Sequence, residues 1–258
     1  MSLQLDIVPD AIWAVWAGLF GLAMGSFFTV AAYRWPREES LVSPRSHCTS
    51  CMRTLRPHEL IPVVSWLVQR GRCRGCGEGI SWRYPAVELA SGGLAAAAIL
   101  TFGPTLEGLA AMVLVLTLVP VVVIDLEHKL IPDIFVLPAA AAALALAVAA
   151  DPDRWWVPVA AAAGASVFLL VLSLVYPGGM GLGDVKLALL LGAVLGLSVV
   201  PALAVAFAAG ALLGAVLLVR LGGAARKMAV PFGPFLATGA LVALWFGPSM
   251  IDWYQGYF

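Results

Sequence analysis

Two aspartates, Asp125 and Asp184, each lie at the end of a long apolar stretch in a chain of 258 residues that is 62% hydrophobic. A carboxylate at the edge of a membrane is costly, so an acid in this position needs a functional explanation. Two carboxylic acids that meet can hydrolyse a peptide bond without a metal or a serine nucleophile. One accepts a proton from water while the other polarises the scissile carbonyl. We therefore interpret the two aspartates as a candidate catalytic pair.

The residues around Asp184 suggest where a substrate could bind. Gly181 and Gly183 precede the acid, and glycines leave room for the backbone of an extended peptide. Asp133 and Lys186 are polar residues close in sequence to the two acids, and we include them as candidate substrate contacts. The predicted substrate-binding set therefore comprises two glycines and two charged residues.

Simpler structural roles remain open for the same residues. Asp184 could be the N-cap of the helix that follows it, because aspartate is favoured at that position. Asp125 could be the polar end of a membrane span, and Asp133 could pair with Lys129 or a nearby arginine. Lys186 could extend its ammonium group to the lipid headgroups.

The four cysteines predict a metal site. They form two Cys-x-x-Cys pairs separated by 21 residues, and the set is Cys48, Cys51, Cys73 and Cys76. Two such knuckles close a tetrahedral zinc site, and four thiolates leave no open position for catalysis. We therefore expect a structural Zn²⁺ that stabilises a segment too small to fold alone. His47 and His58 are alternative ligands.

The composition predicts an all-α polytopic membrane protein. Only 12% of the residues are charged, whereas soluble domains carry roughly a quarter. Because a spanning helix needs roughly 20 apolar residues, we expect about eight transmembrane helices and a small zinc-ribbon segment. The expected spans are 11–33, 84–102, 106–124, 131–150, 156–176, 185–200, 202–220 and 230–247. The break between the sixth and seventh spans rests on residues 198–201.

The basic residues predict the orientation. If the N-terminus lies outside, 14 of the 15 arginines and lysines fall on the cytoplasmic side, nine of them within residues 34–83, and only Arg154 lies outside. The zinc segment and both aspartates are then cytoplasmic, where thiols stay reduced. Residues 1–10 carry no basic residue, so we expect the first span to remain as an anchor. We predict three parts: an anchor at 1–33, a zinc-binding segment at 34–83 and a membrane core at 84–258.

Taken together, these motifs resemble the type IV prepilin peptidases, a family of membrane aspartic proteases with a Gly-x-Gly-Asp signature. The resemblance covers residues 18–240 and rests on the two cysteine pairs, the stretch 125–133, the stretch 181–187 and Pro231-Phe232-Gly233-Pro234-Phe235. Thr29 is a small departure, since many members have asparagine there.

The resemblance implies an enzyme of the bacterial inner membrane. It would remove the basic leader of type IV prepilins or of type II secretion pseudopilins at the cytoplasmic face, with Asp125 and Asp184 as catalytic residues. The presence of the zinc segment implies, in addition, N-methylation of the new N-terminus with S-adenosylmethionine. The expected partners are prepilin or pseudopilin substrates and membrane lipids, and no nucleic acid.

Two features shape this expectation further. The cytoplasmic side as a whole is positively charged, so a basic leader would have to be recognised locally, by acids such as Asp133, Glu127, Glu38 and Glu39. Two other functions remain open, a transporter with a carboxylate proton relay and an assembly scaffold that binds a partner through the zinc ribbon. The scaffold predicts that Asp184→Ala leaves function intact.

Overall fold

The computed structural model describes residues 9–176, 179–228 and 230–256. The described residues form α-helices and short 3₁₀ turns, with two isolated β-bridges and no strand. Close packing divides the chain into two units, residues 1–108 and residues 109–258, and each is described by itself. The three functional parts predicted from the sequence stay a prediction, because these units are defined by packing alone.

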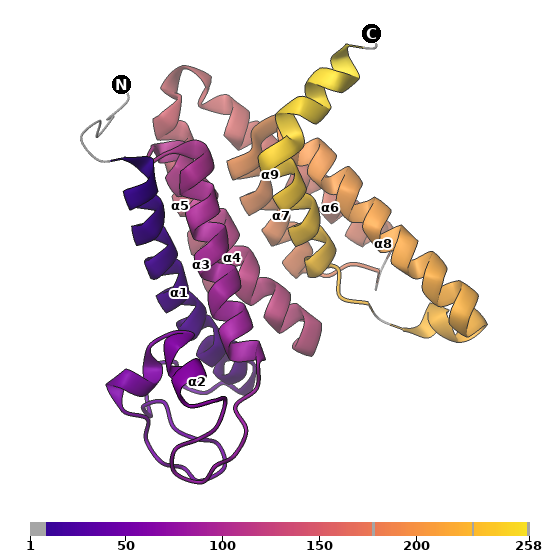
Figure 1. The fold of residues 1–258 in the computed structure, drawn as a ribbon. Helices are drawn as coiled ribbons and strands as arrows, with labels where there is room; N and C mark the ends of the chain where they lie inside the picture. The colour runs from indigo at the N-terminus through magenta and orange to yellow at the C-terminus, as the bar shows by residue number, and fades with distance from the viewer. Residues whose placement is uncertain (1–8, 177–178, 229, 257–258) are drawn as a thin grey trace. The chain divides into compact units, whose positions relative to one another are not determined.

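Unit 1 is built on a pair of antiparallel helices, α1 (Asp10–Arg34) and α3 (Arg83–Phe102), which lie side by side (Figure 1). Small residues allow the two backbones to approach closely. A Cβ added at Gly25 would lie 2.7 Å from the Cα of Glu88, and one at Gly21 would lie 2.5 Å from the carbonyl oxygen of Ser91. The segment between the helices holds short turns only: η1 (Trp35–Arg37), η2 (Pro57–Leu60) and α2 (Val64–Val68).

Unit 2 contains the remaining long helices, although the first three residues of the first of them, 106–108, belong to unit 1. In chain order they are α4 (Leu106–His128), α5 (Asp133–Ala150), α6 (Trp156–Val175), α7 (Leu182–Leu195), α8 (Val199–Leu221) and α9 (Gly233–Gln255). The connecting 3₁₀ turns are η3 (Pro152–Arg154), η4 (Gly196–Ser198) and η5 (Gly222–Lys227). The helix α7 is largely enclosed, with Leu187, Ala188, Leu190 and Leu191 fully buried.

The prediction of a polytopic helical membrane protein is confirmed. Seven helical stretches in the described part of the chain are long and apolar enough to cross a membrane. One of these, Leu182–Ala224, is 43 residues long and contains both α7 and α8. The chain breaks this stretch at Gly196, whose φ of 53° is in the left-handed region that favours glycine. The observed break therefore lies slightly earlier in the chain than the predicted break at residues 198–201.

Contacts with α9 show that α7 and α8 run in opposite directions. Ser198, which follows α7, lies beside Gly247 near the far end of α9. Further along α8, Gly210 lies beside Phe232, which directly precedes α9. Since α8 returns toward the start of α9, the 43-residue stretch is a hairpin of two helices, which agrees with the predicted sixth and seventh spans.

Candidate active site and metal centre

Asp125 lies in the last turn of α4, inside the helix. The apolar run ends at this residue, but the helix continues to His128 and stops at Lys129, whose φ is 56°. The carboxyl group of Asp125 is buried, with 5% of the residue exposed. Its Oδ2 atom accepts a hydrogen bond of 2.8 Å from the backbone N–H of Gly233. The loop before α9 therefore holds this acid in place.

Asp184 lies in the first turn of α7 and is also buried. The helix begins earlier than expected, with Gly181 as the N-cap, so Asp184 is not the N-cap residue. Its Oδ2 atom accepts a hydrogen bond of 3.0 Å from the backbone N–H of Gly181. This is the arrangement in which an acid at the third helical position bonds back to the cap. Its Oδ1 atom is buried and has no hydrogen-bond partner among the described residues.

Both acids lie in unit 2, where each is within the range of the other's charge. Each carboxyl group accepts a hydrogen bond from the backbone N–H of a glycine. These neutral donors orient the acids without neutralising a negative charge on them. The side chain of Glu127, next in the helix beyond Leu126, lies 3.8 Å from His128 and belongs to the exposed end of α4.

The predicted substrate-binding residues lie around this pair. A Cβ at Gly183 would lie 2.8 Å from the Cβ of Ile131, so this glycine allows the loop before α5 to pack against α7. A Cβ at Gly181 would meet only an ordinary contact, 3.6 Å from Asp184 Oδ2. The Lys186 ammonium binds both carboxylate oxygens of Asp133, at 2.8 and 2.7 Å. The partner of Asp133 is thus Lys186, across 53 positions of sequence, and neither Lys129 nor an arginine.

Gly233 contacts Asp125 directly, which the sequence motif alone does not reveal. The Pro231–Phe235 motif marks a loop, but nothing local connects it to an acid 108 positions earlier. A Cβ at this position would lie 2.6 Å from Asp125 Oδ2, so only glycine permits the observed hydrogen bond without displacing the acid.

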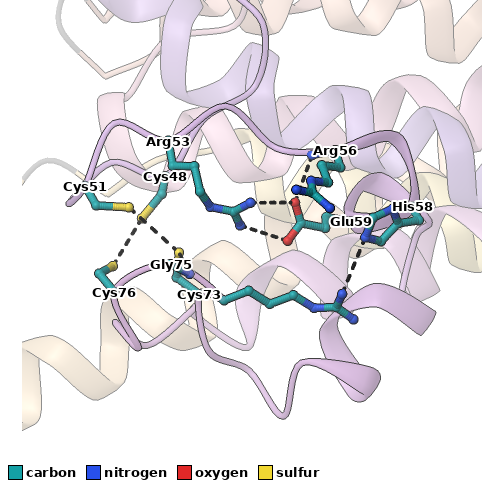
Figure 2. Close-up of polar contacts among 10 residues, drawn as sticks. Cys48, Cys51, Arg53, Arg56, His58, Glu59, Cys73, Gly75 and Cys76 are labelled. Carbon is teal, nitrogen blue, oxygen red and sulfur yellow. Dashed lines mark hydrogen bonds and ion pairs between the residues drawn. The ribbon is translucent and has the colours of Figure 1, made fainter.

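The four cysteines gather in unit 1, as Figure 2 shows. Their sulfur atoms all lie within 4.8 Å of one another, with Cys48 and Cys76 at 3.8 Å and Cys51 and Cys73 at 4.0 Å. All four are free thiols, since these separations are far beyond a disulfide bond. The group could hold a metal ion with tetrahedral geometry.

Two knuckles with the same hydrogen-bond pattern build this group. Cys48 N–H bonds the carbonyl of Arg53, and Met52 N–H bonds that of Cys48; 25 residues later, Cys73 and Gly77 repeat both bonds with Glu78 and Cys73. Met52 and Gly77 both have positive φ, which turns the chain back after each second cysteine.

The knuckles also make their first thiols acidic. Backbone N–H groups of Cys76 and Gly75 lower the pKa of Cys73 to about 6. The equivalent N–H groups of Cys51 and Ser50 lower the pKa of Cys48. Since metals bind the thiolate form, both shifts favour metal binding, whereas burial and the neighbouring thiols raise the pKa of Cys76 to about 12.

An ion pair between a half-buried arginine and a buried glutamate supports the first knuckle. Arg53 binds both carboxylate oxygens of Glu59, at 3.1 and 2.8 Å, and the Arg56 N–H adds a third bond at 2.8 Å (Figure 2). The guanidinium, with that N–H, lowers the pKa of Glu59 to about 2. The two alternative ligands bond elsewhere: His47 contacts the Arg45 carbonyl at 3.0 Å and His58 contacts Arg74 at 3.4 Å.

Comparison with known proteins decides the family. Residues 19–102 match the bacterial peptidase A24 N-terminal domain, and residues 112–219 match the type IV leader peptidase family. A protein of Bacillus subtilis (strain 168) named prepilin leader peptidase/N-methyltransferase is 41% identical over 92% of this chain and 95% of its own length. The chain belongs to the type IV leader peptidase family.

Other relatives support the same family assignment. Proteins with the same name from Legionella pneumophila and Aeromonas salmonicida are 35% and 33% identical, over 93% and 98% of this chain and equal shares of their own lengths. No solved structure matches the chain at a comparable level. The resemblance drawn from the motifs is confirmed by these matches along nearly the whole chain.

Proposed function

We propose that this chain is a membrane aspartic endopeptidase that removes the leader of prepilins or pseudopilins and then methylates the new N-terminus. The names of its relatives support both activities. The observation that carries the peptidase assignment is the pair of buried, interacting aspartates at the end of α4 and the start of α7.

Two neighbouring carboxyl groups that hold one proton between them can perform the hydrolysis. The ionised acid removes a proton from water, and the oxygen attacks the scissile carbonyl carbon. The protonated acid donates a hydrogen bond to the carbonyl oxygen, where negative charge develops. The Gly233 and Gly181 N–H groups fix one oxygen of each acid. The second oxygen of Asp184 is left for water or substrate.

The test is cleavage of a prepilin by the purified protein in detergent, read as product masses. We expect Asp125→Asn and Asp184→Asn each to reduce cleavage by at least about 100-fold, because each removes one member of the acid–base pair. Asp153→Asn is the matched control, since this exposed acid lies in the turn η3. Normal cleavage by the Asp184 variant would reject the mechanism and favour the scaffold.

We further propose that the cysteine group holds a structural zinc ion. With Zn–S bonds of about 2.3 Å, the edges of a tetrahedron of sulfurs are about 3.8 Å. The two shortest separations, 3.8 and 4.0 Å, support this fit. The four ligands would be Cys48, Cys51, Cys73 and Cys76. Because four thiolates leave no open position on the ion, it would stabilise residues 34–83 and take no part in hydrolysis.

Methyl transfer uses S-adenosylmethionine as its second substrate. The new terminal amine attacks the methyl carbon, an N–C bond forms, and the C–S bond breaks with its electron pair remaining on sulfur. The product ammonium then releases one proton to solvent. A gain of one methyl mass after leader loss, present only when the donor is added, tests this step.

A further inference from the structure

A cavity of about 630 Å³ lies within unit 1, beside the cysteine group. Its volume falls within the roughly 300–1,000 Å³ that small-molecule sites occupy. Residues from α1, from the start of α3 and from the segment between them line it. Neither aspartate of the proposed peptidase pair contributes to this cavity, so it is free for another task.

The charge of the cavity selects the chemistry of its ligand. Of the nine arginines between residues 34 and 83, only Arg34 lines it, and both its terminal nitrogens bond backbone carbonyls, of Ser40 at 2.9 Å and Pro44 at 2.7 Å. Four glutamates line the same cavity: Glu39, Glu59, Glu78 and Glu88. One of these, Glu59, is already paired with Arg53. An acidic cavity in an arginine-rich segment favours a cation and disfavours phosphates and anionic lipid headgroups.

Glu88 is the acid with the strongest reason to bind a ligand. It is 6% exposed, and one oxygen accepts a hydrogen bond of 2.7 Å from the Val63 N–H. The Ser26 hydroxyl also bonds this carboxylate. Both donors are neutral, so they orient the buried charge without neutralising it. A buried carboxylate held in this way is suited to meet a positive charge that arrives with a ligand.

The remaining lining suits an adenosine group. Trp66 and Tyr84 supply aromatic surface for a purine ring, whereas the Tyr33 ring is covered by the Arg37 guanidinium at 4.0 Å. Ser65 and Gln69 add polar side chains that can bond hydroxyl groups or ring nitrogens. S-adenosylmethionine combines these features, since it carries a purine and a ribose. It also has a net positive charge, because its sulfonium and ammonium groups outnumber its single carboxylate.

We infer that this cavity is the binding site of the methyl donor, with Glu88 facing its positive charge. The inference rests on the methyl transfer proposed above and assigns it a place in the chain. It is separate from the peptidase pair, so donor binding does not require Asp125 or Asp184.

Binding is measured directly on the full-length, zinc-loaded protein in lipid nanodiscs, by equilibrium dialysis with radiolabelled S-adenosylmethionine. We expect Glu88→Gln to weaken this binding by about tenfold or more, since it removes a charge-assisted contact. Binding of S-adenosylhomocysteine, which lacks the sulfonium, should fall less. Glu107→Gln, an exposed acid of unit 1 outside the cavity, is the matched control and should bind like the wild type. Equal binding by the Glu88 variant, or an equal loss in the control, would overturn the inference.

A second measurement needs no variant. Irradiation of the wild-type protein with the radiolabelled donor attaches label to nearby side chains, and the labelled peptide is identified by mass spectrometry. We expect label within residues 26–34 or 65–88. Label within residues 109–258 would place the donor outside this cavity. Displacement of the donor by an equimolar basic leader peptide would assign the cavity to the leader instead.

The two proposals fail in different ways. If the same preparation cleaves and methylates a prepilin while label maps outside unit 1, the cavity assignment is wrong and the enzyme assignment stands. If it cleaves the prepilin without adding a methyl group, the proposed methyl transfer is wrong and the cavity assignment is rejected with it.

Discussion

At the scale of single residues, the Oδ1 atom of Asp184, which is buried and meets no hydrogen-bond donor in the described ranges, distinguishes this acid from an ordinary helix cap. A buried acceptor without a donor costs about 1–3 kcal/mol. A residue whose only task was to cap α7 would use its Oδ2 bond to Gly181 and leave Oδ1 in solvent. The burial of this second oxygen therefore supports a role beyond capping.

The glycines before Asp184 give a matched pair of substitutions. We expect Gly183→Ala to destabilise the protein by about 1–3 kcal/mol, because the added methyl would lie 2.8 Å from Ile131 Cβ. Gly181→Ala should change stability little, since its φ of −88° and ψ of 155° suit any residue and its N–H is retained. Thermal unfolding in detergent measures both. An unaltered melting temperature for Gly183→Ala would contradict the tight packing against Ile131.

Cleavage kinetics of the Gly181 variant then test its predicted contact with substrate. A raised KM with unchanged stability would support that contact. Wild-type kinetics would limit Gly181 to its place as the N-cap of α7.

At the scale of helices, the ion pair between Asp133 and Lys186 joins the first residue of α5 to the fifth residue of α7. About half of the Asp133 side chain is exposed, so the pair contributes at most about 1 kcal/mol. Its value lies in the position of α7, which carries Asp184 two residues before Lys186.

Exchanging the two charges separates structure from recognition. We expect the double variant Asp133→Lys, Lys186→Asp to recover the melting temperature lost in either single variant, because the pair can form again. The KM for prepilin should stay raised, since a lysine at position 133 repels the basic leader. Recovery of KM in the exchanged variant would show that the pair acts only between helices.

The metal segment yields a second prediction at this scale. Replacing Cys48 and Cys51 with serine should release the zinc and make residues 34–83 sensitive to limited proteolysis, because each knuckle is too small to fold alone. Methyl transfer should fall more than leader cleavage. Metal content by mass spectrometry and protease digestion are the measurements. Thr49→Ala keeps both thiols and should keep the metal; equal losses of the two activities would argue against separate sites.

Local patterns explain what the sequence could predict about these elements. The metal group follows from two knuckles of four residues, and the spans follow from runs of apolar residues. The ends of the helices are harder to predict from such patterns. Hydropathy marks where a chain leaves the membrane, whereas hydrogen bonding decides where a helix stops. Thus α4 continues through Leu126, Glu127 and His128 although the apolar run ends at Asp125. The contacts of Asp125 with Gly233, and of Asp133 with Lys186, join distant parts of the chain and leave no local signal.

At the scale of the whole molecule, the distribution of basic residues predicts one orientation in the membrane. A reporter enzyme that is active only outside the cytoplasm should be inactive when fused within residues 34–83 or after Arg220. It should be active when fused after Asp153, beside Arg154. The reverse pattern would move the proposed active site to the wrong face for a cytoplasmic leader. Equal activity at all three positions would contradict the helix order.

The groups that orient the two acids have a consequence for genetics. Both are main-chain amides, contributed by Gly181 and Gly233. Exchange of one side chain for another does not delete an amide hydrogen unless the newcomer is proline. An alanine variant at Gly181 would therefore overlook its donor, whereas alanine at Gly233 would displace Asp125 through its added methyl group and not through loss of the amide. Replacing either amide with an ester by chemical synthesis would isolate the contribution of the hydrogen bond itself.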